Sequence, residues 1–290
     1  MQEILRNNPE DKHRARAWAF GLGLSAYISI VMILGSGGSE VDTDAILRLD
    51  PIFLLAIQGI VATLMFIGVS ALFIGIALKI PFSEFFPKVS LSTVVMVILI
   101  SISFMVVNSA IGEWNMNLDF GDSEFANWAQ QSEEQLKVLT EHLTNFTSTT
   151  HFILAFVVVA IIPAIGEELL FRGLIQNFFS KAFANHHVAI WITGFLFAAI
   201  HMQFFGVMPR MFLGVLFGYL YHWSGKLTVA MIGHLVNNGL ALIALYLANS
   251  GTIEVSPEEI EQSAPWPAVL VFVVISFFLI RSFYKKFQHA

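Results

Sequence analysis

Long apolar segments separated by polar loops constrain the fold of this chain more than any other feature. A membrane-spanning helix needs about 20 mostly apolar residues, and eight segments come close to that length. They cover about 17–36, 52–79, 89–111, 151–179, 188–205, 207–223, 227–249 and 266–283. The short alternating segments of barrel strands are missing, so each span is expected to be helical. The sequence therefore predicts an all-α polytopic membrane protein, a bundle of about eight transmembrane helices.

The composition agrees with a single membrane domain over residues 1–290. Only 12% of the residues are charged, whereas ordinary globular domains carry about 25%. The chain has no cysteine, which excludes disulfides and thiolate metal sites. Its net charge of −6 comes from acidic loops and gives no reason to expect a nucleic-acid partner. A polar loop at about 112–150 has a helical pattern from Asn127 to Leu143, which predicts an amphipathic helix on the outer face.

The charges of the loops alternate in sign along the chain. Basic residues occur before the first span and in every second loop: Arg6, Lys12, Arg14, Arg16, Lys79, Lys88, Lys181, Lys226, Arg281, Lys285 and Lys286. The intervening loops are acidic, around Glu40, Glu113 to Glu141, and Glu254 to Glu261. Because basic loops stay in the cytoplasm, both termini are predicted to be cytoplasmic. We expect a multi-pass protein of the cell (inner) membrane.

Charged residues interrupt the fourth apolar segment at Glu167-Glu168-x-x-x-Arg172. An ionised side chain near the bilayer centre costs about 2.5–3.5 kcal/mol on insertion scales, so these charges require compensation or a function. Glu168 and Arg172 are four residues apart and can pair on one helix face. The pair would leave Glu167 free to point into the bundle as a candidate general base. The plainer alternative is a salt bridge at the end of a helix.

Two later apolar segments carry further polar groups. The first is Phe197-x-x-x-His201, where a histidine satisfied at the membrane interface is the plainer interpretation. The second is His234-x-x-x-Asn238, where His234 and Asn238 share one helix face and could instead be an inert polar patch between helices. Arg210, after Pro209, is interpreted as a helix-start residue or a headgroup anchor.

The three motifs together resemble the CPBP family of intramembrane proteases. This family includes the CAAX prenyl endopeptidases and the bacteriocin-processing and self-immunity proteins. The resemblance covers about residues 150–240, which would be the catalytic core. It implies the catalytic residues Glu167, His201, His234 and Asn238, with Glu168 and Arg172 as supporting residues.

The resemblance implies hydrolysis of a peptide bond. Glu167 and His201 would activate a water, and His234 with Asn238 would donate hydrogen bonds to the oxyanion of the tetrahedral intermediate. A metal-assisted form stays open, with Glu167, His201 and His234 as ligands of a divalent ion such as zinc. The zinc-protease motif His-Glu-x-x-His is absent, as are Gly-x-Ser-Gly and Gly-x-Gly-Asp. The four catalytic side chains must converge, and we expect them to do so in the cytoplasmic half of the membrane.

Two other classes of function compete with the protease. A transporter or proton relay could use the same intramembrane glutamate and histidines, although the sequence has no inverted repeat of the kind found in transporters. A noncatalytic immunity or scaffold protein could retain the motifs without activity. For the protease, the expected partners are a peptide or membrane-anchored protein substrate and the lipid bilayer. The sequence indicates neither the substrate nor an oligomeric state.

Overall fold

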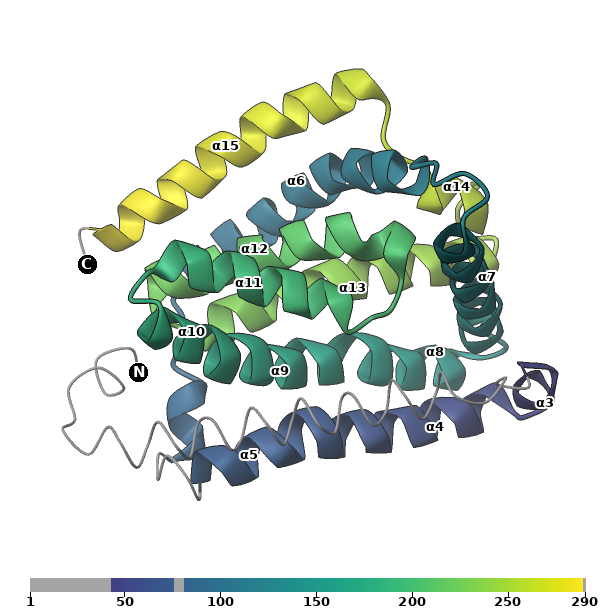
Figure 1. The fold of residues 1–290 in the computed structure, drawn as a ribbon, viewed down its shortest axis with the longest axis horizontal. Coiled ribbons are helices and arrows are strands. Elements are labelled where there is room, and N and C mark those ends of the chain that lie inside the picture. The colour runs from purple at the N-terminus through teal and green to yellow at the C-terminus, as the bar shows by residue number, and fades with distance from the viewer. Residues whose placement is uncertain (1–42, 76–80, 289–290) are drawn as a thin grey trace.

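The computed structural model describes residues 43–75 and 81–288, and every regular element in those ranges is a helix (Figure 1). In chain order the elements are α3 (Thr43–Leu47), α4 (Pro51–Ala62), η1 (Thr63–Gly68), α5 (Val69–Phe73), η3 (Phe82–Phe85), α6 (Leu91–Met116), α7 (Glu124–Thr144), α8 (Thr149–Ala155), η4 (Phe156–Ile161), α9 (Ile162–Glu168), η5 (Leu169–Gln176), α10 (Asn177–Ala182), α11 (His186–Ala199), η6 (Phe204–Gly206), α12 (Val207–Ser224), α13 (Leu227–Asn249), α14 (Pro257–Glu261) and α15 (Trp266–Gln288). The predicted all-helical class is therefore confirmed.

Six helical segments of the described ranges are long and apolar enough to cross a membrane. They are Pro51–Phe73, Leu91–Met116, Thr149–Ala182, Phe204–Ser224, Leu227–Asn249 and Trp266–Gln288. The predicted span 17–36 lies outside the described residues, and the segment 188–205 is not one long helix. The predicted count of eight spans is thus not confirmed.

The correction at 188–205 has a local structural reason. Helix α11 has only 14 residues, which at 1.5 Å per residue is about 21 Å, less than the roughly 30 Å hydrocarbon core. Its last turn tightens, with His201 N bonded to Ala198 O at 3.2 Å and Met202 N to Ala199 O at 3.1 Å. Met202 then has a φ of 52°, a left-handed conformation that cannot continue an α-helix. The apolar run continues past this point, so hydropathy alone did not locate the helix end.

The two ends of the bundle differ in charge. At the left in Figure 1 lie the α10–α11 turn, the α12–α13 turn and the C-terminal end of α15, which carry Lys181, Lys226 and Lys285. At the right lie the acidic helices α7 and α14. The alternating loop charges therefore collect at opposite ends of the fold. This agrees with the predicted topology, while the assignment of one end to the cytoplasm stays a prediction.

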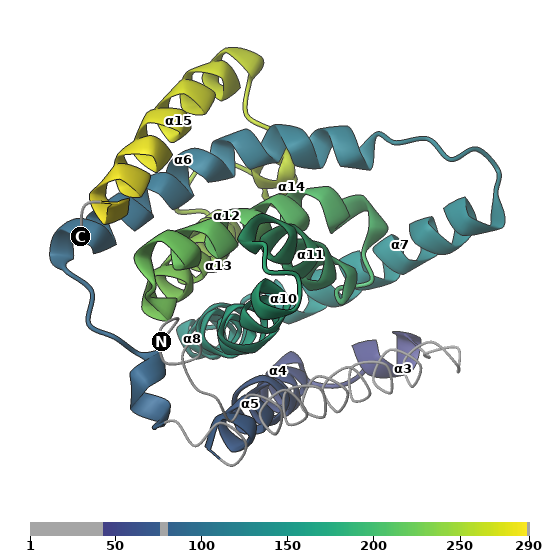
Figure 2. The ribbon, with the colours of Figure 1, turned by 60° about the vertical axis from the view of Figure 1, so that its left-hand side comes forward.

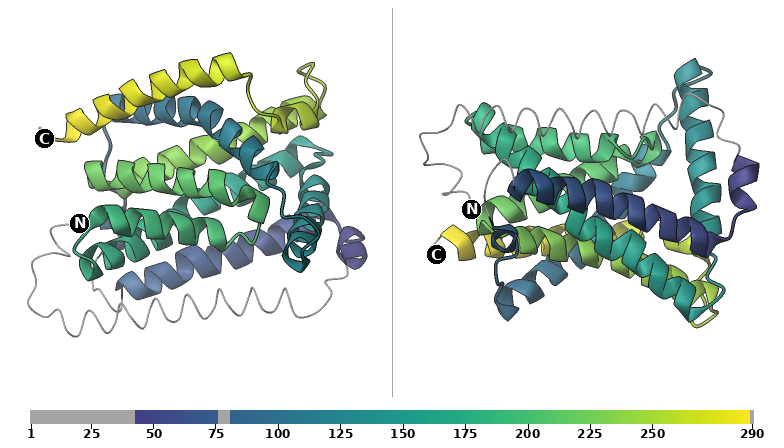
Figure 3. Two further views of the ribbon diagram at one scale, coloured as in Figure 1. Left: turned by 45° about the horizontal axis from the view of Figure 1, so that its top comes forward. Right: turned by 90° about the horizontal axis from the view of Figure 1, so that it is seen from below.

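Helices α11 and α12 lie side by side (Figures 2 and 3) and cross closely at glycines. A Cβ atom on Gly194 would lie 2.8 Å from Val215 Cγ2, and one on Gly214 would lie 3.0 Å from the Gly194 Cα. Both distances are shorter than nearly all real Cβ contacts, so an added methyl group at either glycine would force its neighbours to shift. Gly214 at this crossing also presents its carbonyl oxygen to Arg172 of η5.

The segment Thr149–Ala182 contains two wide π-helical stretches, η4 and η5, on either side of α9. Wide turns of this kind are rare and often occur at functional sites. The side chain of Asn177 donates to the carbonyls of Arg172 and Gly173, each at 2.9 Å, and Gln176 Nε2 donates to Gly218 O at 3.1 Å. These bonds satisfy backbone carbonyls around η5 and attach it to α12.

The polar loop contains the predicted helix, α7, which lies across one end of the bundle (Figure 3). Ser123 caps its first turn by accepting a hydrogen bond from Ala126 N at 3.1 Å. At its other end, His151 Nε2 bonds to Leu143 O at 3.0 Å, and Asn249 Nδ2 donates to Thr144 O at 2.9 Å. Helix α7 is therefore fastened to the ends of α8 and α13.

Candidate active site

The predicted Glu168–Arg172 pair forms inside the bundle. Arg172 Nη1 lies 2.7 Å from Glu168 Oε1, and both side chains are fully buried. Arg172 Nη2 donates to Gly214 O at 2.9 Å, which the close approach of α12 makes possible. Because the second amino group also has an acceptor, the guanidinium is held between α9 and α12. The pair lies inside the protein and not on its surface, while its depth in the membrane stays a prediction.

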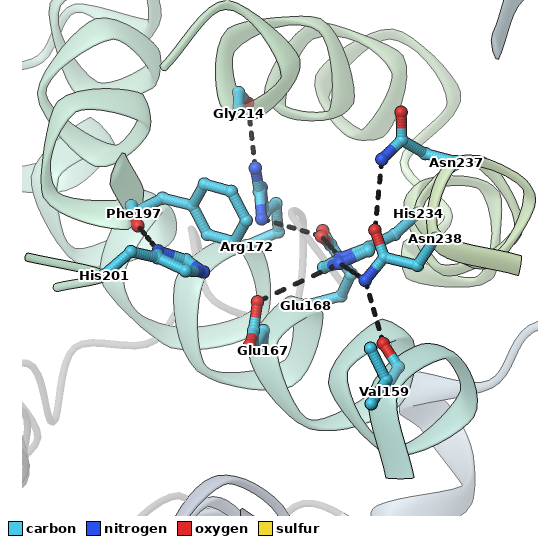
Figure 4. A network of polar contacts seen from close by, with 10 residues as sticks. All are labelled: Val159, Glu167, Glu168, Arg172, Phe197, His201, Gly214, His234, Asn237 and Asn238. Atoms are coloured by element: carbon cyan, nitrogen blue, oxygen red, sulfur yellow. Dashed lines mark hydrogen bonds and ion pairs between the residues drawn. The ribbon is translucent and has the colours of Figure 1, made fainter. Parts of the chain in front are cut away.

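His234 of α13 joins the same carboxylate oxygen (Figure 4). Its Nδ1 lies 2.8 Å from Glu168 Oε1. An ionised carboxylate only accepts hydrogen bonds, so Nδ1 carries the proton and, in the neutral ring, Nε2 is an acceptor. Glu168 Oε1 therefore binds one donor from its own helix segment and one from α13. This shared oxygen fixes the orientation of the His234 ring.

Asn238 lies one turn beyond His234 and continues the network. Its Nδ2 lies 3.2 Å from His234 Nε2 and donates to Val159 O in η4 at 3.1 Å. Asn237 Nδ2 donates to Asn238 Oδ1 at 3.1 Å, which fixes the direction of the Asn238 amide. Asn237 was expected to be a packing or interhelix hydrogen-bonding residue, because it lies about 100° from Asn238 around the helix, so this bond to its neighbour was not predicted.

Glu167 is the carboxylate that the network leaves unengaged. Its side chain is buried, with 8% of its surface exposed. Its Oε2 lies 3.9 Å from His234 Nε2, which is too long for a hydrogen bond, and no donor among the described residues reaches this oxygen. A buried carboxylate without a donor is costly. This free oxygen is available to bind a water or a substrate group.

His201 approaches from the opposite side, at the end of α11. Its Nδ1 lies 2.8 Å from Phe197 O, so Nδ1 donates and Nε2 keeps a lone pair in the neutral ring. Figure 4 shows the ring directed toward Glu167. The Phe197 ring contacts the rings of His201 and His234, with centroids 5.2 and 5.8 Å apart. No hydrogen bond joins His201 to Glu167, so their predicted action as a pair stays a prediction.

Two carboxylates and one guanidinium lie in the middle of the network. The Arg172 Cζ also lies 4.8 Å from the centre of the Phe197 ring, a cation–π contact. Across residues 43–75 and 81–288, no group of three or more His, Cys, Asp or Glu side chains is placed to hold a metal ion, and a metal-assisted reaction stays a prediction. Glu168 is already bonded to Arg172 and His234.

Arg210 was interpreted as a helix-start residue or a headgroup anchor, and it does lie in the first turn of α12. Its contacts with the protein were not predicted: Nη2 donates to Gln203 Oε1, and the side chain interacts electrostatically with Glu167 and Glu133. The sequence did indicate that Arg210 needs partners, because it is the one charged residue in the predicted span 207–223. The free-energy cost of placing a charge in an apolar span, which singled out Glu167, applies equally to Arg210.

The segment that carries these side chains is similar to a known class of protease. Residues 149–240 match the family described as type II CAAX prenyl endopeptidase Rce1-like. This match confirms the resemblance predicted from the motifs, over that segment. All six predicted site residues, from Glu167 to Asn238, lie inside it.

A protein of Bacillus subtilis (strain 168) described as "Uncharacterized protein YpbD" is 30% identical over 77 residues. The matched region is 25% of this chain and 36% of that relative, so the chain matches only about a third of the relative's length. No solved structure matches the chain. The activity, substrates and partners of the whole protein are therefore matters for proposal.

Proposed function

We propose that this protein is an intramembrane endopeptidase that hydrolyses a peptide bond in a peptide or a membrane-anchored protein. One observation carries the proposal. The Oε2 atom of Glu167 is buried and has no hydrogen-bond donor among the described residues. It lies next to a fixed network that includes His234, in the segment that matches an endopeptidase family. A general base needs such a free oxygen within reach of a water.

The water would bind between Glu167 and His201. The Nε2 lone pair of His201 accepts one of its protons in a hydrogen bond, while Glu167 removes the other proton. The water oxygen then forms a bond to the carbonyl carbon of the substrate and gives a tetrahedral oxyanion. Glu167 passes its proton to the amide nitrogen, the carbon–nitrogen bond breaks, and a carboxylic acid and a free amine leave.

His234 and Asn238 would stabilise the oxyanion. In the neutral ring, His234 Nε2 accepts a hydrogen bond from Asn238 Nδ2. When His234 is protonated, Nε2 becomes a donor and the Asn238 N–H is released. Both N–H groups can then point at the oxyanion, and each such donor contributes about 2.7–4 kcal/mol in a preorganised site.

The bond to Glu168 holds the His234 ring in both of these forms. Glu168 keeps accepting from Nδ1, so the ring does not need to move when Nε2 takes up its proton.

The remaining parts of the proposal follow from the sequence. The enzyme would be a multi-pass protein of the cell (inner) membrane, with its site nearer the cytoplasmic side and with both termini in the cytoplasm. A metal-assisted reaction with Glu167, His201 and His234 as zinc ligands stays a prediction, and the zinc content of the purified protein tests it. No step of the mechanism above depends on a metal.

The proposal is tested by comparing new protein termini in cells that produce the wild type, Glu167→Gln or Glu254→Gln. Glu254 is exposed on the loop before α14 and provides a matched control. We expect a set of cleaved termini in the wild type and the control that is missing with Glu167→Gln. Identical termini in all three would contradict the protease, and ion flux in liposomes that is lost only with Glu167→Gln would favour a transporter.

A further inference from the structure

The segment that presents His201, Ile200–Gly206, is bonded to the preceding helix only at its start. His201 Nδ1 lies 2.8 Å from Phe197 O, and the last bond back to α11 runs from Met202 N to Ala199 O. Met202 adopts a φ of 52°, and residues other than glycine occupy this region only when their surroundings impose it. The contacts that hold the segment beyond Met202 therefore come from other elements.

Gln203 supplies two of these contacts. Its Oε1 accepts a hydrogen bond from Arg210 Nη2 on α12, and its Nε2 lies 3.5 Å from Glu133 Oε1 on α7. The neighbouring carbonyl, Phe204 O, accepts from Asn115 Nδ2 on α6 at 3.3 Å. Helices α12, α7 and α6 therefore hold the segment at Gln203 and Phe204, which are two and three residues after His201.

Arg210 lies at the centre of these contacts. Its guanidinium packs against the backbone at Gly206, where an added Cβ would come within 2.8 Å of Arg210 Cζ. The same cation interacts electrostatically with Glu133 on α7 and with Glu167 on α9. It thus contacts the His201 segment and also interacts with the candidate base.

Aromatic side chains of α7 and of the residues just before it contact the same Ile200–Gly206 segment. The ring of Phe204 packs edge-on against Phe120 and Phe125, with centroids 5.0 and 4.9 Å apart. Phe125 in turn contacts Trp128, at 5.8 Å. Helix α7 and the His201 segment therefore share one packed interface, and Arg210 connects this interface with the active site.

We propose that Arg210 is a positioning residue for the reaction: it holds the Ile200–Gly206 segment through Gln203 and thereby keeps His201 opposite Glu167. Arg210 does not touch the substrate. The inference deepens the proposed function and depends on it, because the alignment of His201 with Glu167 matters only if the two activate a water. Helix α7 belongs to the same positioning device through Glu133.

The test uses Arg210→Met, Arg210→Lys and the matched control Arg281→Met, each in the full chain reconstituted in liposomes. Arg281 is exposed on α15. For Arg210→Met we expect kcat to fall about 10- to 100-fold with KM nearly unchanged, since misplacement of a catalytic group by about 1 Å costs on the order of 10²-fold. Lysine can still donate to Gln203 but lacks the fork of arginine, so Arg210→Lys should recover part of the loss. Arg281→Met should behave as the wild type.

A second measurement does not depend on activity. Hydrogen exchange of peptides that cover Ile200–Gly206 should be faster in Arg210→Met than in the wild type, while exchange in α13 stays unchanged. Gln203→Leu removes the same hydrogen bond without changing a charge and should give the same pattern. If Arg210→Met does not fold, Gln203→Leu decides the question alone.

The possible outcomes separate this inference from the proposed function. If Glu167→Gln abolishes cleavage but Arg210→Met keeps the wild-type kcat, the positioning role is wrong and the protease stands. An increase in KM at constant kcat would mean that Arg210 binds substrate, and it would overturn the inference as well. If Glu167→Gln cleaves as well as the wild type, the proposed function is wrong, and the positioning role of Arg210 falls with it.

Discussion

His234 and Arg172 bind the same oxygen of Glu168, at 2.8 and 2.7 Å. The shared oxygen connects α13 to the α9–η5 segment, and Arg172 Nη2 connects the segment to α12 through Gly214 O at 2.9 Å. Glu168 thus fixes three helices relative to one another and leaves the adjacent Glu167 free. The two neighbouring glutamates therefore differ in their contacts, as the spacing of Glu168 and Arg172 predicted.

Breaking the buried ion pair should destabilise the protein strongly. Glu168→Gln leaves Arg172 with an uncompensated charge in a fully buried position, and removal of one partner of such a pair costs about 3–5 kcal/mol. Unfolding in mixed detergent micelles measures the effect. Glu141→Gln is the control, because the exposed Lys137–Glu141 pair is 3.9 Å long and such pairs contribute about 0–1 kcal/mol. Equal effects of the two substitutions would contradict the buried pair.

Asn238→Ala should impair catalysis more than stability. The substitution removes a proposed oxyanion donor, and the loss of one such donor lowers kcat about 10²- to 10³-fold. Steady-state cleavage in liposomes gives kcat and KM separately. Asn117→Ala serves as the control, because this exposed side chain only donates to Glu113 O in its own helix turn, at 2.9 Å. A change in KM alone would exclude the oxyanion role of Asn238.

The α11–α12 crossing should not tolerate a methyl group on Gly194. An added Cβ would lie 2.8 Å from Val215 Cγ2 and 3.1 Å from the backbone oxygen of Met211. Overpacking of this kind costs about 1–3 kcal/mol, so Gly194→Ala should unfold at a lower temperature or detergent fraction. Gly75→Ala, where an added Cβ meets nothing within 4 Å, should change stability little. Equal stability of the two variants would contradict the close approach of α11 and α12 at Gly194.

A disulfide can test the packing of α15 against α6. The Oγ atoms of Ser103 and Ser276 lie 3.0 Å apart, and the chain contains no cysteine that could react instead. The double substitution Ser103→Cys with Ser276→Cys should therefore form a crosslink under mild oxidation. Electrophoresis after cleavage of the intervening chain detects it. Ser101→Cys with Ser276→Cys should crosslink far less, because positions 101 and 103 are about 200° apart around the helix.

Several parts of the fold and site were predictable because they depend on local sequence. Hydropathy located the six long spans that the structure describes, and helix periodicity gave α7. The Glu168–Arg172 pair followed from a spacing of four residues. Each of these features is set by residues that are near one another in the chain.

Other features could not be predicted because they depend on tertiary contacts. The bond from His234 to Glu168 joins residues 66 positions apart, and nothing in either motif specifies it. The early end of α11 lies within an apolar run, where hydropathy does not change. The contact between Arg210 and Gln203 was not predicted because Gln203 lies on a turn that exists only after α11 has ended.

The most direct test of the account is the cleavage rate of wild type, Glu167→Gln and Glu254→Gln in liposomes, on a substrate found by the comparison of cellular termini. The reaction is run in ¹⁸O-labelled water and followed by mass spectrometry. We predict one labelled oxygen in each new carboxyl terminus, a loss of at least about 10²-fold in kcat for Glu167→Gln, and an unchanged rate for Glu254→Gln. A Glu167→Gln protein that cleaves within tenfold of the wild-type rate would contradict the central claim that this buried carboxylate activates the water.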